Sequence, residues 1–186
     1  MKKILLAGIL GGLVAFVCSS AIHMSPLGSM GLSVLNDKEE TVLTALKSNI
    51  QNDGLYFFPG MDMSKSMTTE EQNAWNAKYK AGPVGLLLYH PSGGDAMSPK
   101  QLGAEFLTTL ICGLIAAFIL ASTVGSLSAR AMLVGFIGLF AWVAISVSQW
   151  NWYGFPFKFI LVDGLDQVIG WIAAGFVMAK IVKPAK

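Results

Sequence analysis

The chain is poor in charged residues. Asp, Glu, Lys and Arg together make up 13% of its 186 residues, while hydrophobic residues reach 54%. Soluble domains usually carry about 25% charged residues. The net charge of +2 is small, and no basic stripe with interleaved aromatic residues is present, so we expect no nucleic-acid partner. The shortage of charge indicates that much of the chain lies in a lipid bilayer.

Cysteine is also scarce. Cys18 and Cys112 both lie inside long apolar stretches, and neither belongs to a CxxC pair or a zinc-type spacing. These facts exclude a disulfide framework and a cysteine zinc site. Both thiols lie too deep in apolar sequence for a Cys–His nucleophile, and no Ser-His-Asp arrangement stands out. Because no catalytic set is complete, we do not expect an enzyme.

Four long apolar stretches dominate what remains, at residues 4–22, 102–123, 132–150 and 157–179. Each is close to the roughly 20 residues that a helix needs to cross about 30 Å of hydrocarbon. The first stretch, which follows Lys2 and Lys3, also fits a secretory signal peptide, but its length allows it to cross the bilayer as the other three do. We therefore interpret all four stretches as membrane spans.

The predicted fold class is an all-α membrane protein, a bundle of four transmembrane helices with a small mixed α/β extracytoplasmic cap. The first span occupies residues 1–23, the cap residues 24–98, and spans two to four residues 99–186. Short turns join the last three spans, which predicts that these three are neighbours in an up-down bundle.

Lysine and arginine are distributed unequally between the two ends of the spans. One side holds Lys2, Lys3, Arg130, Lys180, Lys183 and Lys186 with no acidic neighbour, while every carboxylate from Asp37 to Asp166 belongs to the other half. Cytoplasmic loops carry the excess of basic residues. The pattern predicts a multi-pass protein of a bacterial inner membrane with both termini in the cytoplasm.

The cap sequence contains signals for two helices and two short strands. Asn36 with Glu39, and Thr68 with Glu71, resemble capping boxes, which predict helices near 37–50 and 68–80. Apolar runs at 55–58 and 84–89 read as strands. A segment of this size with few aliphatic residues makes a weak core, so we expect it to rest on the outer ends of the spans or on a partner protein.

Polar residues inside the spans gather at one depth, in the predicted outer leaflet. This intramembrane polar belt comprises His23, Glu105, Gln149, Asp163, Asp166 and Gln167. Charged groups in a span are costly and need partners, so we expect Asp163 or Asp166 to pair with His23 or Glu105. Three interpretations stay open: a site for a proton, cation or small polar ligand, a hydrogen-bonded belt that locks the helices, and an interface with another subunit.

Methionine is concentrated in one loop of the cap. Met61, Met63 and Met67 lie within seven residues, and His90 follows later in the same segment. Thioether sulfur is a soft ligand suited to Cu(I), so these four residues are candidate copper ligands. Methionine also fills irregular gaps in apolar packing, which is the alternative explanation.

Small residues and three short motifs bear on assembly. Gly8-x-x-x-Gly12 and Ala7-x-x-x-Gly11 predict a face of the first span on which another helix packs closely.

The stretches 54–60, 82–91 and 98–102 (GLYFFPG, GPVGLLLYHP and SPKQL) resemble those of uncharacterised four-span bacterial inner-membrane proteins, a resemblance that implies no activity. We predict a structural or accessory subunit that binds other membrane subunits or itself, with a ligand-, proton- or metal-binding membrane protein as the alternative.

Overall fold

The computed structural model describes residues 1–62 and 64–185 and is mostly helical. The chain forms two compact units, one made of Met1–Leu32 with Ala96–Lys186 and the other of Ser33–Asp95. We refer to the first as the membrane unit and to the second as the hairpin unit. Each is described by itself.

Four helices of the membrane unit are long and apolar enough to cross a membrane. They are α1 (Lys2–His23), α4 (Pro99–Ala121), the helix Leu127–Tyr153 and α7 (Phe157–Ile181). The third consists of α5 (Leu127–Ala141), a π-helical segment η3 (Trp142–Val147) and α6 (Ser148–Tyr153). The structure thus contains the four long apolar helices that the sequence predicted. They are compatible with an integral membrane protein.

Side-chain caps fix where these helices begin. Ser98 and Gln101 form a capping box at the start of α4, with Pro99 as its first residue, and Ser126 caps α5. Gly154, with φ of 70°, ends α6 in a left-handed conformation that glycine adopts without strain. The short turn that follows leads directly into α7.

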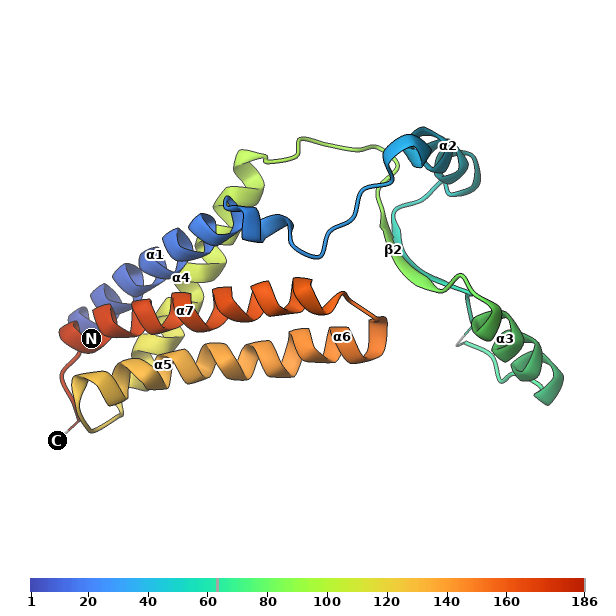
Figure 1. The fold of residues 1–186 in the computed structure, drawn as a ribbon. Helices are drawn as coiled ribbons and strands as arrows, with labels where there is room; N and C mark the ends of the chain where they lie inside the picture. Colours follow the sequence, from blue (N-terminus) through green and yellow to red (C-terminus); the bar gives the residue numbers. More distant parts are fainter. Residues whose placement is uncertain (63, 186) are drawn as a thin grey trace. The chain divides into compact units, whose positions relative to one another are not determined.

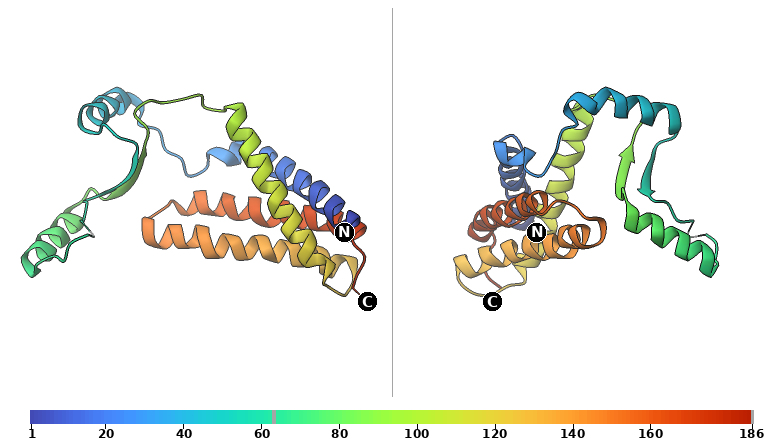
Figure 2. Two further views of the ribbon diagram at one scale, coloured as in Figure 1. Left: turned by 180° about the vertical axis from the view of Figure 1, so that it is seen from behind. Right: turned by 45° about the vertical axis from the view of Figure 1, so that its right-hand side comes forward.

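The helices of the membrane unit follow the spatial order α4, α1, α7, α5. Helix α1 packs along both α4 and α7, and α5 packs along α7, whereas α4 has little contact with α5 or α7. Figures 1 and 2 show α5 and α7 running side by side while α4 crosses them obliquely. The predicted neighbourhood of the last three spans is therefore correct for α5 and α7 and wrong for α4.

Glycine on α1 explains why α4 lies beside it. A Cβ atom on Gly113 of α4 would lie 2.9 Å from the Cα of Gly12, and one on Gly8 would lie 2.7 Å from the Cα of Leu114. Gly11 instead faces the side chain of Met178 on α7. The two small-residue motifs of α1 thus face two different helices of the same chain, and both approaches require the missing side chains.

The packed core lies toward the end of the membrane unit that holds both chain termini (Figure 1). Its buried residues are Ala7, Ala15, Ala116, Ala117, Leu120, Val134, Ala174, Met178, Ala179 and Val182. Most come from the first half of α1 or α5 and from the second half of α4 or α7. We call the opposite end, where the polar belt residues lie, the distal end.

Arg130 holds the terminal end together. Its side chain is 2% exposed and donates hydrogen bonds to the carbonyl oxygens of Leu120 (2.9 Å) and Val182 (2.8 Å) and to the hydroxyl of Thr123 (3.1 Å). These carbonyls belong to the ends of α4 and α7, where a cation also interacts favourably with the helix dipole. The sequence pattern placed Arg130 at the cytoplasmic ends of the spans and did not predict this role.

The hairpin unit contains η2 (Asn36–Lys38), α2 (Glu39–Asn49), β1 (Gly54–Phe58), α3 (Thr69–Ala81) and β2 (Gly85–Tyr89). The two strands pair antiparallel, with Gly54 opposite Tyr89 and Phe58 opposite Gly85. The predicted capping box of α3 is confirmed. That of α2 is wrong, because Asn36 adopts φ of 49° inside η2 and α2 begins after Lys38 without a side-chain cap.

Candidate functional site

Asp166 of α7 is the most buried carboxylate of the distal polar belt. Asp166 is 7% exposed, and its Oδ2 atom accepts a hydrogen bond from the hydroxyl of Ser19 at 3.0 Å. The Nε2 atom of His23 lies 3.6 Å from the same oxygen, and the His23 side chain is 58% exposed. Asp166 therefore bonds α7 to α1, and the structure brings together the aspartate and histidine that the sequence singled out.

Asp163 lies one turn earlier on α7 and contacts a different helix. It accepts a hydrogen bond from the hydroxyl of Ser146, a buried residue in the π-helical segment η3. Nearby, the indole nitrogen of Trp142 donates to the carbonyl oxygen of Ile160 at 2.7 Å. The two carboxylates thus hold α7 to its two neighbours, Asp166 to α1 and Asp163 to the helix that contains α5.

The polar residues of α4 are bonded differently. Glu105, Thr108 and Thr109 lie at helical spacing, and the two threonine hydroxyls donate to the carbonyl oxygens of Ala104 and Glu105 within α4 itself. The carboxylate of Glu105 lies 3.4 Å from the Thr109 hydroxyl. Among the described residues, no side chain of α1, α5 or α7 hydrogen-bonds to these three. The polar face of α4 is therefore satisfied only locally.

A cavity of about 130 Å³ separates this face from α7 and α1. It is lined by Ala15, Ser19, Glu105, Thr108, Thr109, Cys112, Asp166, Gln167, Gly170 and Trp171. At roughly 30 Å³ per water molecule, the space suits about four waters or one small polar group. Two carboxylates thus border a single cavity, which the sequence could not show because it did not give the helix order.

An apolar cavity of about 180 Å³ adjoins the first one. Its lining adds Ile115, Ala116, Ile137, Gly138 and Ala141, and it shares Cys112, Gln167 and Trp171 with the polar cavity. We call the two together the α4 groove. It is polar toward the distal end and apolar toward the core, and it exists because α4 diverges from α5.

Gln167 and Gln149 complete the predicted belt. The Oε1 atom of Gln167 accepts a hydrogen bond from the indole nitrogen of Trp171 at 3.2 Å. Gln167 borders both parts of the α4 groove and also a third cavity of about 350 Å³, which Gln149 and Asp163 line as well. All six belt residues thus lie on cavities or paired contacts of the distal end.

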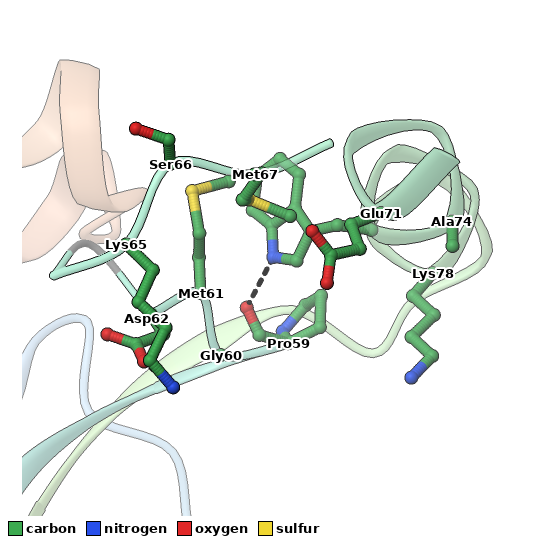
Figure 3. A pocket seen from close by; sticks show the side chains of 11 residues that line it. Pro59, Gly60, Met61, Asp62, Lys65, Ser66, Met67, Glu71, Ala74 and Lys78 are labelled. Atoms are coloured by element: carbon green, nitrogen blue, oxygen red, sulfur yellow. Dashed lines mark hydrogen bonds and ion pairs between the residues drawn. The ribbon is translucent and has the colours of Figure 1, made fainter. Parts of the chain in front are cut away.

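The methionine residues lie in the hairpin unit. Met61 and Met67 both line a pocket of about 640 Å³ beside Trp75 and Lys78 of α3 (Figure 3). The indole nitrogen of Trp75 donates to the carbonyl oxygen of Pro59 at 3.0 Å, which holds the ring against the loop. Two thioethers and an aromatic ring thus share one pocket. Met63 lies outside the described residues.

Asp62 organises the loop between these methionines. Its carboxylate accepts hydrogen bonds from the hydroxyl and the backbone nitrogen of Ser64, at 2.6 and 3.0 Å. These bonds, chiefly that of the hydroxyl, lower the pKa of Asp62 below its ordinary value of 3.8. The carboxylate is therefore charged at neutral pH, and it lies 3.5 Å from the ammonium group of Lys65.

His90 is separated from the two described methionines. It follows Tyr89, which pairs with Gly54, whereas Pro59 follows the opposite end of β1. At about 3.3 Å per residue, the two ends of the hairpin lie about 13 Å apart. His90 instead lies 3.3 Å from Asp53. The structure therefore does not bring His90 to Met61 and Met67.

Two further observations bear on the identity of the site. Within residues 1–62 and 64–185, no group of three or more His, Cys, Asp or Glu residues is placed to hold a metal ion. No protein-family model, no curated protein and no solved structure matches the chain. A proposal about its function therefore rests on the geometry described above.

Proposed function

We propose that the protein is an accessory subunit of a larger membrane assembly, in which the hairpin unit binds a protein partner. The observation that supports this is the exposed apolar face of the hairpin. Leu55 and Phe57 of β1 share that face with their cross-strand partners Leu88 and Leu86 of β2. Leu55 and Leu88 are 65% and 67% exposed. We call these four residues the hairpin face.

The hairpin unit has little that could stabilise it alone. Tyr89 is the only buried residue among the described residues between Ser33 and Asp95. An isolated two-stranded hairpin is marginal in water, and contiguous exposed apolar surface usually marks an interaction site. A protein partner would remove the hairpin face from water and supply the missing core.

The charge of the hairpin unit favours a protein over a lipid surface. Residues 33–95 contain eight Asp or Glu and five Lys, a net charge of −3. Anionic lipid attracts basic segments and would repel this unit. A partner with basic residues around an apolar patch would complement it, since complementary charge steers association.

Native mass after gentle detergent extraction tests the proposal. The unmodified chain should be recovered in a stoichiometric complex, and Leu88→Asp should release it at the mass of the free chain. Ser92→Asp, an exposed position three residues after Tyr89, is the matched control and should leave the complex intact. A free chain in every sample would refute subunit status. A complex that persists in Leu88→Asp would refute the hairpin face as the contact.

A ligand-binding membrane protein is the second candidate function. It is favoured by the polar part of the α4 groove, where Glu105 and Asp166 border one cavity. The pocket shared by Met61 and Met67 favours a soft cation such as Cu(I) within the same class. Neither site depends on the hairpin face, so each is tested separately.

A further inference from the structure

We propose that the α4 groove binds a hydrophobic amine, a molecule with a protonated amino group carried directly on an apolar body. The proposal rests on the second candidate function and names the chemical class of its ligand. It is carried by the two-part shape of the groove and by the charges on its wall.

The groove changes from polar to apolar along α4. Glu105 lies six residues into the helix and Ala116 seventeen residues into it, which at about 1.5 Å per residue corresponds to about 9 and 26 Å from its start. The polar cavity of about 130 Å³ and the apolar cavity of about 180 Å³ adjoin at Cys112. A single molecule with a polar head and an apolar body matches that order.

The two carboxylates of the polar part favour a cation. Glu105 and Asp166 both border it, and the only basic side chain that the described residues place near either carboxylate is that of His23, at 3.6 Å from Asp166. A carboxylate at this depth in a membrane is costly without a partner. A protonated amine supplies the positive charge, and the hydroxyls of Ser19 and Thr108 can accept its N–H groups.

Among the described residues, no lysine or arginine forms an ion pair with Glu105 or Asp166, and His23 is a cation only when it is protonated. Lys100 lies five residues before Glu105 on α4, about 7.5 Å nearer the helix start, and helical side chains tilt toward the N-terminus, away from the groove. Lys158 likewise lies in the first turn of α7.

Phospholipids fit the groove less well than a simple amine. In a phospholipid with an amino head group, the phosphate lies between the amine and the acyl chains. It would therefore sit beside Glu105 and Asp166, where like charges repel. An amine attached directly to a hydrocarbon body avoids this, and contacts with Ile115 and Ile137 of the apolar cavity would stabilise that body.

Alkylation of Cys112 reports occupancy, because this thiol borders both parts of the groove and is exposed. The experiment uses the full-length chain in nanodiscs with Cys18 replaced by Ala, and octylamine, octanol and octanoate as probes. Octylamine should slow alkylation about tenfold at saturation, while octanol and octanoate should have little effect. Glu105→Gln should weaken octylamine protection about tenfold, and Glu40→Gln in the hairpin unit should not.

The outcomes separate the ligand class from the function on which it rests. If octanol protects Cys112 as well as octylamine does, or if Glu105→Gln binds octylamine normally, the groove binds apolar molecules and the amine proposal fails. If no probe slows alkylation, the groove is not a ligand site, and of the second candidate function only the methionine pocket remains to be tested. Neither result bears on the native-mass test of the hairpin face.

Discussion

The contact between α1 and α4 gives the sharpest quantitative prediction. Gly113→Ala places a methyl group 2.9 Å from the Cα of Gly12, and because backbone atoms cannot turn aside, the two helices must separate. Gly103 lies on the same helix with no atom within 4 Å of its would-be Cβ. Both substitutions gain about 0.5–1 kcal/mol of helix propensity, so the difference between them isolates the clash.

Overpacking a well-packed interface costs about 1–3 kcal/mol. We therefore expect Gly103→Ala to be neutral or stabilising and Gly113→Ala to be less stable than Gly103→Ala by about 1–3 kcal/mol. Reversible unfolding in mixed micelles, followed by helical circular dichroism, measures both. Equal free energies of unfolding for the two variants would show that α1 and α4 do not meet at these glycines.

Three further predictions address other parts of the chain. Arg130→Met should cost about 1–3 kcal/mol in the same unfolding assay, because the buried carbonyl oxygen of Val182 loses its donor, while that of Leu120 keeps the hydroxyl of Thr123; Arg130→Lys should lose less, and equal losses would contradict the hydrogen-bonding role. If the methionine pocket holds Cu(I), changing both Met61 and Met67 to Leu should abolish stoichiometric binding under reducing conditions, and an unmodified chain that binds none would end the copper hypothesis. A cysteine at Ser92 should react with an impermeant thiol reagent in intact cells while one at Ser128 should not, and the reverse labelling would overturn the predicted orientation.

The membrane helices could be predicted because lipid leaves a backbone few alternatives. Every amide in hydrocarbon needs an internal partner, so long apolar runs become helices. The third run was read as 132–150, but the helix spans Leu127–Tyr153. The prediction stopped at Arg130 because a charge marks the end of an apolar run. The structure buries this charge against the carbonyl ends of α4 and α7, a contact between segments that no local pattern reveals.

The spatial order of the helices could not be predicted from the sequence, for a related reason. Short turns keep α5 and α7 adjacent, but the turn between α4 and α5 constrains only the ends that it joins. The small residues of α1 indicate close packing without naming the partner. Gly113 on α4 completes one contact and Met178 on α7 the other, so α1 occupies the place beside α4 that the predicted order gave to α5.

The candidate site was predicted as a set of residues at one depth, and the structure divides that set by bonding. Asp163 and Asp166 each accept a hydrogen bond from a neighbouring helix, so removing either carboxylate disturbs the packing of α7 as well as any binding site. Glu105 lies on the same cavity as Asp166 but bonds only within α4. The helix contacts do not depend on its carboxylate. A change at Glu105 therefore tests ligand binding with the fold intact, whereas a change at Asp166 would confound the two.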